Sequence, residues 1–119
     1  MLIVDDISEN IETISEMIKD FDIDVKTANG GKEAIEQAFS AAYAQGLVHY
    51  VAEDEAAEGG FLSAAAFTGR DDMQVTVTGN DDRILLVARF DNLGKGSSGA
   101  AIQNMNLVLG VPEATGLNV

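Results

Sequence analysis

The stretch that decides the fold is MQVTVTGNDDRILLVARF, residues 73–90. Apolar and polar residues alternate over 73–78, which predicts a strand with one face in water and the other against a core. The polar residues 79–82 predict a hairpin turn, and the apolar run 84–90 predicts a returning strand that is more fully buried. We therefore expect an antiparallel pair of strands, with Met73 in the core.

The beginning of the chain follows a different pattern. A short apolar run over 2–4 is typical of a strand buried on both faces of a parallel sheet. Ser8 is a candidate cap for a helix whose apolar residues recur at helical spacing up to Phe21. A second strand over 23–27 and a second helix over about 32–45 follow. This order predicts a right-handed β-α-β unit with two parallel strands.

The remaining segments complete the predicted fold. Residues 47–51 are expected to form a third strand and 62–67 a weaker one, because alanine disfavours strands. The acidic, glycine-ended segment 52–60 predicts a loop. A last helix over 97–109 is expected to cover the open face of the sheet, which would make Met105 a core residue.

Together these patterns predict an α/β fold. Its mixed sheet has a parallel β-α-β start, is extended by an antiparallel hairpin, and is covered by about three helices.

Composition excludes several classes of protein. The 119 residues carry a formal net charge of −13, which repels a phosphate backbone, so we expect no nucleic-acid partner. No apolar run reaches the ~20 residues that a bilayer requires, so we expect no membrane partner and a soluble protein that is expressed in the cytoplasm. Cysteine is absent, which excludes disulfides, thiolate metal sites and a cysteine nucleophile.

The segment LIVDDISENIETISEMIKDFDIDVKTANGGKEAIEQA, residues 2–38, resembles the first part of a response-regulator receiver domain, a flavodoxin-like fold. The acidic pair after the first strand and the VKTANGGKEA run carry the resemblance. It implies that Asp5 and Asp6 correspond to residues that help to bind Mg²⁺. The phosphoacceptor surroundings are missing around Asp54, and phosphoryl transfer needs more than two acids. We therefore expect Asp5 and Asp6 to be a vestigial pair without a functional metal.

Residues 39–117 resemble the C-terminal portion of N-acetyl-gamma-glutamyl-phosphate reductase, and DNLGKGSSGAAIQNMNLVLG, residues 91–110, is the most specific part. The resemblance implies an NADPH-dependent enzyme whose final loop borders the nicotinamide pocket. The positions that would carry this role are Asn92, Lys95, Gly96 and Gly99. The family's cysteine nucleophile and its dinucleotide-binding domain are missing. We therefore expect no enzyme, no cofactor and only vestigial binding positions.

Two further candidates have a functional and a structural interpretation. The glycine-serine loop 94–99 at a helix start could hold an anion on free N–H groups, but a purely structural loop is favoured. His49 is the only histidine, and a sheet histidine without a catalytic role is favoured because no nucleophile accompanies it.

Our interpretation is an artificial chimera: one hybrid domain over 1–119, built from a fragment 1–38 and a fragment 39–119, with the seam inside the helix 32–45. Its role would be to fold, with no native biochemical activity. The alternatives are a weak Mg²⁺ or anion binding module and a degenerate receiver-like signalling domain. Fragments cut from larger bodies bring apolar patches and an unpaired strand edge, so we expect a monomer in equilibrium with a symmetric homodimer.

Overall fold

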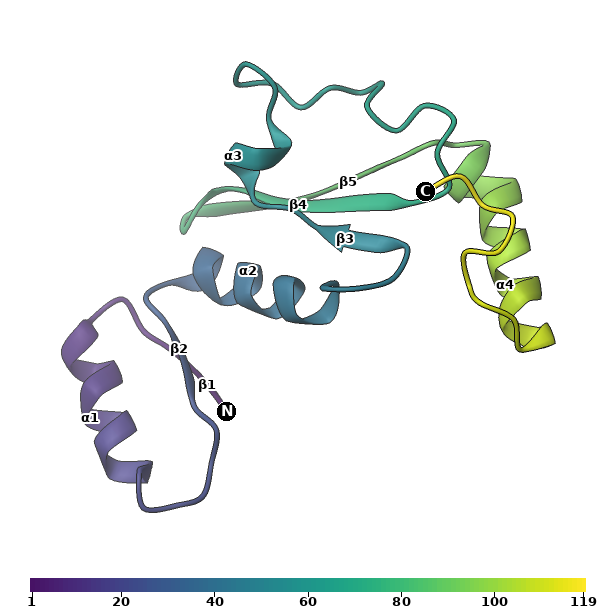
Figure 1. Ribbon diagram of the computed structural model, residues 1–119. Helices are drawn as coiled ribbons and strands as arrows, with labels where there is room; N and C mark the ends of the chain where they lie inside the picture. Colours follow the sequence, from purple (N-terminus) through teal and green to yellow (C-terminus); the bar gives the residue numbers. More distant parts are fainter.

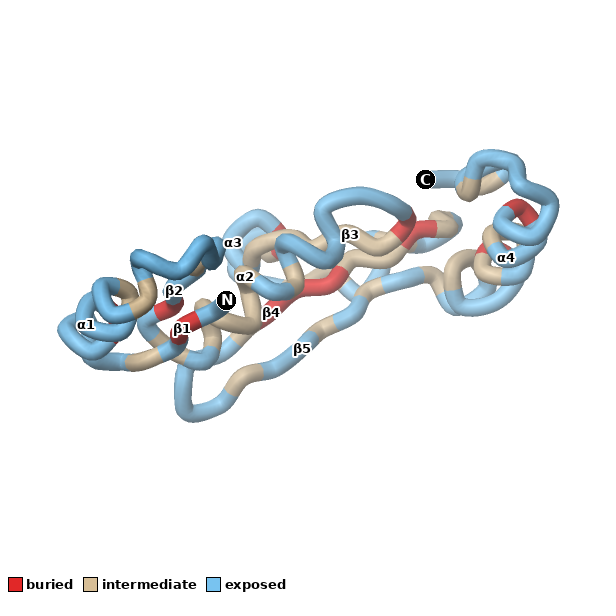
Figure 2. The backbone as a smooth tube through the Cα atoms, turned by 90° about the horizontal axis from the view of Figure 1, so that it is seen from below, coloured by how far each residue is buried: buried red, intermediate tan, exposed pale blue.

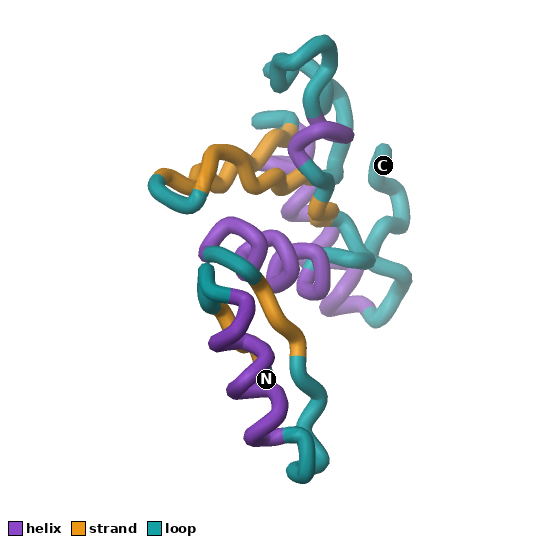
Figure 3. The backbone as a smooth tube through the Cα atoms, turned by 90° about the vertical axis from the view of Figure 1, so that its left-hand side faces the viewer, coloured by secondary structure: helices purple, strands orange, loops and turns teal.

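The structure is a computed structural model that describes residues 1–119, and it holds two small sheets on either side of helix α2 (Gly31–Ala42) (Figures 1 and 3). Helix α2 contacts strands of both sheets. The molecule is flat and extended, at 50 × 38 × 17 Å with a radius of gyration of 18.2 Å. A compact chain of this length would have a radius of gyration of about 13–14 Å.

The two sheets differ in size and direction. The elements follow in the order β1 (Leu2–Val4), α1 (Ser8–Ile18), β2 (Lys26–Ala28), α2, β3 (Val48–Tyr50), α3 (Glu53–Ala56), β4 (Met73–Asn80), β5 (Arg83–Phe90), a π-helix (Gly94–Ser98) and α4 (Gly99–Leu109). Strands β1 and β2 pair in parallel. In the second sheet β3 is parallel to β4, and β5 is antiparallel to β4.

The predicted α/β class, the parallel β-α-β start and the antiparallel hairpin are confirmed. The strands form two separate sheets and not one, because helix α2 lies in space between the β1–β2 sheet and the β3–β4–β5 sheet (Figure 1). None of the helices is long and apolar enough to cross a membrane.

The hairpin forms where the alternating sequence predicts it. Its strands pair residue for residue from Met73 with Phe90 to Asn80 with Arg83. The Asn80 side chain closes the turn, because its Oδ1 accepts the N–H groups of Asp82 and Arg83 at 3.1 and 3.0 Å. The largest run of buried residues lies on β4, over 75–77.

The expectation that the returning strand is the more buried one is wrong. Strand β5 is the last strand of its sheet, so no neighbour covers its outer side. Leu85 is 62% exposed and Leu86 is 55% exposed. The first strand is also less buried than predicted, because only Ile3 of β1 is buried in a sheet of two strands.

The core is small. Only 11 of the 119 residues are buried, and they are scattered along the strands and the ends of the molecule (Figure 2). Met105 is 53% exposed and not a core residue, and Met73 is only half-buried. Helix α4 stands at the end of the larger sheet and does not cover its face (Figure 1).

Three local predictions also need correction. Residues 62–67 form no strand and lead into turns over 64–69, and the segment predicted as a loop contains the short helix α3. Ser8 is the first residue of α1 and makes no side-chain cap. Asp5 Oδ1 accepts the N–H of Ile7, the residue before the helix, at 2.8 Å and the side-chain amide of Asn10 at 3.1 Å.

The turn of the hairpin is joined to the start of α2. Asp81 Oδ1 accepts the backbone N–H of Lys32 at 2.9 Å, in the first turn of the helix, where N–H groups have no partner within the helix. Gly30 leaves room for this approach, because a Cβ there would lie 2.6 Å from Asp81 Oδ1 and the carboxylate would have to move. Lys32 Nζ bonds Glu53 Oε2 at 3.1 Å, and this hydrogen bond raises the pKa of Lys32.

We predict that Asp81→Ala lowers the free energy of unfolding by about 1 kcal/mol, as the loss of a helix N-terminal cap does. The matched control is Asp82→Ala in the same turn, whose side chain accepts no hydrogen bond within the chain. Urea unfolding followed by circular dichroism measures both. Equal stability of the two variants would contradict the capping role.

Candidate functional site

The segment after β5 is organised by one carboxylate. Asp91 Oδ1 accepts the N–H groups of Leu93 at 2.8 Å and Gly94 at 2.7 Å, and Oδ2 accepts the N–H of Gly69 at 2.9 Å. These bonds, the one from Gly69 foremost, hold the pKa of Asp91 below its usual value. Charge-assisted bonds of this kind are the strong ones, so Asp91 fixes the path of the chain into the π-helix.

The neighbouring amides of the loop are also occupied. Lys95 donates its N–H to Arg70 O at 3.4 Å, Gly96 donates to Asp91 O at 2.9 Å, and Ser98 donates to Leu93 O at 3.0 Å. An anion on this loop would need these N–H groups to be free. The geometry therefore favours the structural interpretation of 94–99, in which Asp91 already supplies the negative charge.

The structure brings three of the four predicted binding positions, Lys95, Gly96 and Gly99, into one turn. A Cβ at Gly99 would collide with the Asp71 carboxylate, so this glycine allows a close approach of two segments. Lys95 Nζ bonds the side chain of Gln103 on α4. The Asn92 side chain forms no hydrogen bond within the chain. The loop is thus a joint between β5, the segment 69–71 and α4.

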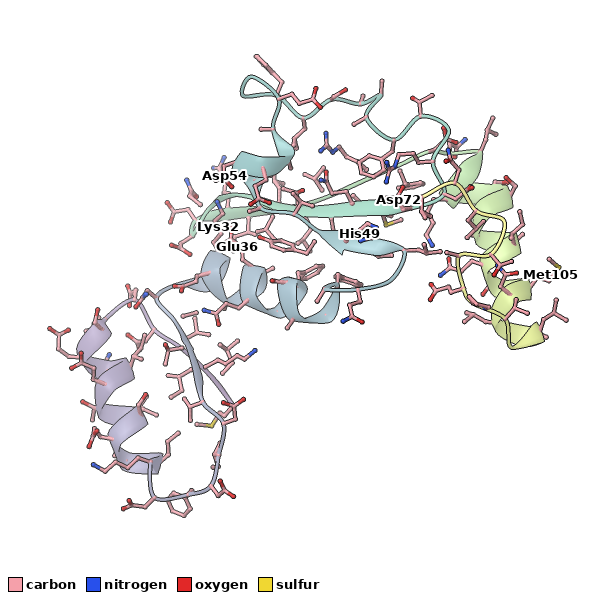
Figure 4. All side chains as sticks on the ribbon, viewed as in Figure 1. Lys32, Glu36, His49, Asp54, Asp72 and Met105 are labelled. Atoms are coloured by element: carbon pink, nitrogen blue, oxygen red, sulfur yellow. The ribbon has the colours of Figure 1, made fainter.

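A second polar cluster lies at the start of β4. The Asp72 side chain is 1% exposed and receives two bonds from Arg70, Nε to Oδ1 at 2.7 Å and Nη2 to Oδ2 at 2.6 Å. His49 Nε2 lies 3.4 Å from Asp72 Oδ2 (Figure 4). The hydrogen bond from Arg70 lowers the pKa of Asp72.

Sequence reasoning took His49 as an isolated residue and missed this partnership. The signal that could have found it is the charged run Arg70-Asp71-Asp72 directly before an alternating strand. A buried carboxylate can orient an imidazole for proton transfer. No hydroxyl group bonds His49 in the structure, so the cluster lacks a nucleophile in place.

The acidic residues singled out in the sequence, Asp5, Asp6 and Asp54, do not converge. Asp5 is used at the start of α1, and no group of three or more carboxylate or imidazole side chains is arranged to hold a metal ion. Asp54 lies on α3, beside Glu53 and the Lys32–Glu36 pair, around an open cavity of about 560 Å³ (Figure 4). Lys32 neutralises part of this cavity's charge.

About half of the chain is similar to N-acetyl-gamma-glutamyl-phosphate reductases. The reductase 2 of Nostoc sp. is 58% identical over 62 residues, which are 50% of this chain and 19% of that protein. The reductase of Allorhizobium ampelinum is 46% identical over 80 residues, 65% of this chain and 26% of that protein. The reductase of Brucella ovis is 47% identical over 68 residues, 56% of this chain and 22% of that protein.

The chain thus spans between 19% and 26% of the length of these curated relatives. No family model matches the chain. No solved structure matches it either.

The comparisons confirm the resemblance to the reductase for about half of the chain and correct one prediction. The chain was expected not to be an enzyme, but the relatives that it matches are named as an enzyme. That expectation gave too much weight to the missing cysteine and too little to the sequence identity with these reductases.

We predict that Asp72→Asn lowers the free energy of unfolding by about 1–3 kcal/mol at pH 7, because a buried carboxylate paired with Arg70 is lost. The folded pKa of Asp72 is lowered. The stabilisation is therefore present above the unfolded value of about 3.9 and is lost as pH falls through the folded pKa.

The measurement is urea unfolding of parent and variant from pH 7 down to the lowest pH at which both fold. The difference between them should shrink below pH 4. Asp6→Asn, at an exposed aspartate that accepts no hydrogen bond, is the control. A pH-independent difference would contradict the ion pair as its source.

We also predict that Asp91→Ala loosens the joint. The backbone N–H groups of Gly69, Leu93 and Gly94 lose their acceptor, so their hydrogen exchange should accelerate and α4 should lose protection with them. Asn92→Ala removes a neighbouring side chain without a hydrogen bond and should leave exchange unchanged. Equal exchange in the two variants would show that Asp91 does not hold the loop.

Proposed function

We propose that the chain is an artificial hybrid whose functional part is the reductase-like one. That part would supply the C-terminal sheet, loop and helix of an N-acetyl-gamma-glutamyl-phosphate reductase. The observation that carries the proposal is the Asp91-anchored joint, which lies in the most specific stretch of the resemblance, 91–110. The 58% identity over 62 residues supports the same assignment.

The division of the structure around α2 supports the hybrid. The β1–β2 sheet and the β3–β4–β5 sheet are not paired with each other, and α2 contacts both. We propose one hybrid domain, with a receiver-like part over 1–38 and a reductase-like part over 39–119, joined inside α2. A helix is a suitable seam because its apolar residues can face a different sheet on each side.

The contribution of the reductase-like part would be to position a loop. The resemblance implies that NADPH-dependent reduction takes place beside this loop. A loop held by a carboxylate at its start and by the bond from Lys95 to Gln103 of α4 presents the same backbone to a ligand at every encounter, which lowers the entropic cost of binding. Asn92, whose side chain is unbonded, is the residue best placed to face a ligand.

A weak Mg²⁺ or anion binding module has less support. Asp5 already accepts two hydrogen bonds, and the amides of 93–96 are already donated. Any ion would have to compete with these internal partners.

The test is an exchange of segments. Residues 39–117 of this chain replace the corresponding segment of the Nostoc reductase, and NADPH oxidation that depends on the acyl phosphate is measured. We predict that the exchanged enzyme keeps its activity to within about tenfold. The exchanged segment should keep the geometry of the loop, and the loss of one contact corresponds to about tenfold. The same exchange with Asp91→Ala should lose further activity, and with Val108→Ala it should not. A folded but inactive exchange protein would refute the proposal.

A further inference from the structure

We propose that Asn29 is a site of spontaneous chemical modification, in which the backbone nitrogen of Gly30 attacks its side-chain amide and converts it to a carboxylate. The two residues connect β2 to α2, the helix that contacts both sheets (Figure 1). The modification therefore acts on the joint between the two sheets. It is independent of the reductase assignment, because it needs only this chain and water.

The sequence singles out Asn29 among the asparagines. It is the one asparagine that is followed by glycine. The others, which precede aspartate or a bulky apolar residue, are Asn10, Asn80, Asn92, Asn104, Asn106 and Asn118. A side chain on the following residue hinders the attack by its backbone nitrogen and restricts the dihedral angles that the attack needs, whereas glycine does neither.

The fold leaves the attacking nitrogen available. Strand β2 ends at Ala28 and α2 begins at Gly31, so Asn29 and Gly30 belong to neither element. The N–H of Gly30 donates no hydrogen bond within the chain. This nitrogen can therefore lose its proton without the loss of a backbone hydrogen bond, which is what protects most peptide groups of a folded chain.

The side chain under attack is also accessible. Asn29 is exposed, and its Oδ1 accepts no hydrogen bond within the chain. Its Nδ2 donates to Glu33 Oε2 at 3.2 Å, and its backbone N–H donates to the same oxygen at 2.7 Å. The side-chain bond is long and lies at the surface, so it adds little to the barrier for the reaction.

The first step closes a ring. The Gly30 nitrogen gives its proton to hydroxide and forms a bond to Asn29 Cγ, while the bond from Cγ to Nδ2 breaks. Nδ2 takes a proton from water and leaves as ammonia, and the product is a cyclic imide. No oxidant or reductant takes part.

The second step opens the ring with water. Attack at Cγ breaks its bond to the Gly30 nitrogen and gives aspartate. Attack at the backbone carbonyl carbon of Asn29 breaks the other bond to that nitrogen and gives isoaspartate, in which the chain runs through Cγ. Each event consumes one water, releases one ammonia and makes the chain more negative by one charge.

The new charge is placed where carboxylates already gather. Glu33 Oε2 accepts the amide of Asn29, and Asp81 Oδ1 accepts the N–H of Lys32 in the first turn of α2. A carboxylate at position 29 donates no hydrogen bond to Glu33 and repels it instead. The conversion thus replaces an attraction by a repulsion at the start of the helix.

Isoaspartate also changes the length of the backbone. It adds one carbon to the chain between Ala28 and Gly30, and Gly30 has little room to move, because a Cβ there would lie 2.6 Å from Asp81 Oδ1. The bond from the Lys32 N–H to Asp81 lies two residues further along. We therefore expect the isoaspartate form to loosen the contact between α2 and the hairpin.

The first test is incubation of the folded chain at pH 8, with samples taken over several days. Mass spectrometry of its peptides follows the replacement of NH₂ by OH, and chromatography separates the aspartate and isoaspartate peptides. The reference is the synthetic peptide VKTANGGKEA, residues 25–34. We expect Asn29 in the folded chain to react within about tenfold of the peptide's rate, because the fold protects neither reacting group.

Two glycine variants provide the matched comparison. Gly30→Ala should slow the reaction by about tenfold or more, because it places a side chain on the attacking residue. Gly31→Ala should leave the rate unchanged, since a Cβ there meets only Ile84 Cδ1 at an ordinary 3.5 Å. An Asn29 that stays intact after the peptide has been converted, or faster conversion of another asparagine, would overturn the site.

The second test measures the effect on the joint. The isoaspartate form is separated by anion exchange, and hydrogen exchange of the Lys32 amide is compared with that of the parent chain. We expect faster exchange, and a smaller acceleration in Asn29→Asp, which carries the charge without the added backbone atom. Unchanged exchange in the isoaspartate form would overturn the effect on the joint, and equal acceleration in both would refute the lengthened backbone as its cause.

Discussion

The hydrogen bond from the Lys32 N–H to the Asp81 carboxylate ties helix α2 to the β4–β5 hairpin. It joins residues that are 49 positions apart and places the tip of the β4–β5 hairpin on the first turn of α2. A negative charge at this end of a helix is favourable, because the first amides point outward without partners. Since α2 contacts strands of both sheets, this bond adds a polar contact to the packing that places the β1–β2 sheet relative to the hairpin.

Much of the remaining architecture depends on similar polar joints, because apolar burial is limited. Only seven of the buried residues are hydrophobic. Asp91 secures the turn after β5, the Arg70–Asp72 pair secures the start of β4, and the buried Asn106 holds the tail by donating to Glu113 O and Thr115 O. Carboxylates and amides with several partners specify direction, which apolar contacts do not. A flat molecule can therefore keep a defined arrangement of segments.

The sequence predicted what local patterns determine. Alternation over 73–78 and a polar turn were enough to find the hairpin, and helical spacing found α1, α2 and α4 to within a few residues. The candidate loop was singled out by resemblance, and three of its four residues lie in one turn. The joints could not be predicted, because Asp81 with Lys32 and Asp91 with Gly69 are pairs formed only by the tertiary fold. The same holds for His49, whose partner Asp72 is distant in sequence.

The largest disagreement between sequence and structure concerns β5, and it carries physical information. Hydrophobic composition reflects the environment in which a strand is stable, whereas exposure is measured on one chain by itself. Strand β5, whose even-numbered residues are all apolar, is open at its edge, and this composition is suited to a larger sheet. Helix α4 shows a related excess at Leu107, Val108 and Leu109, all more than half exposed. The two surfaces differ in one respect: β5 carries unpaired backbone groups at the edge of its sheet, while α4 has its backbone bonded internally. An open sheet edge can be extended by a further strand, whereas an apolar helix face alone fixes no direction of pairing.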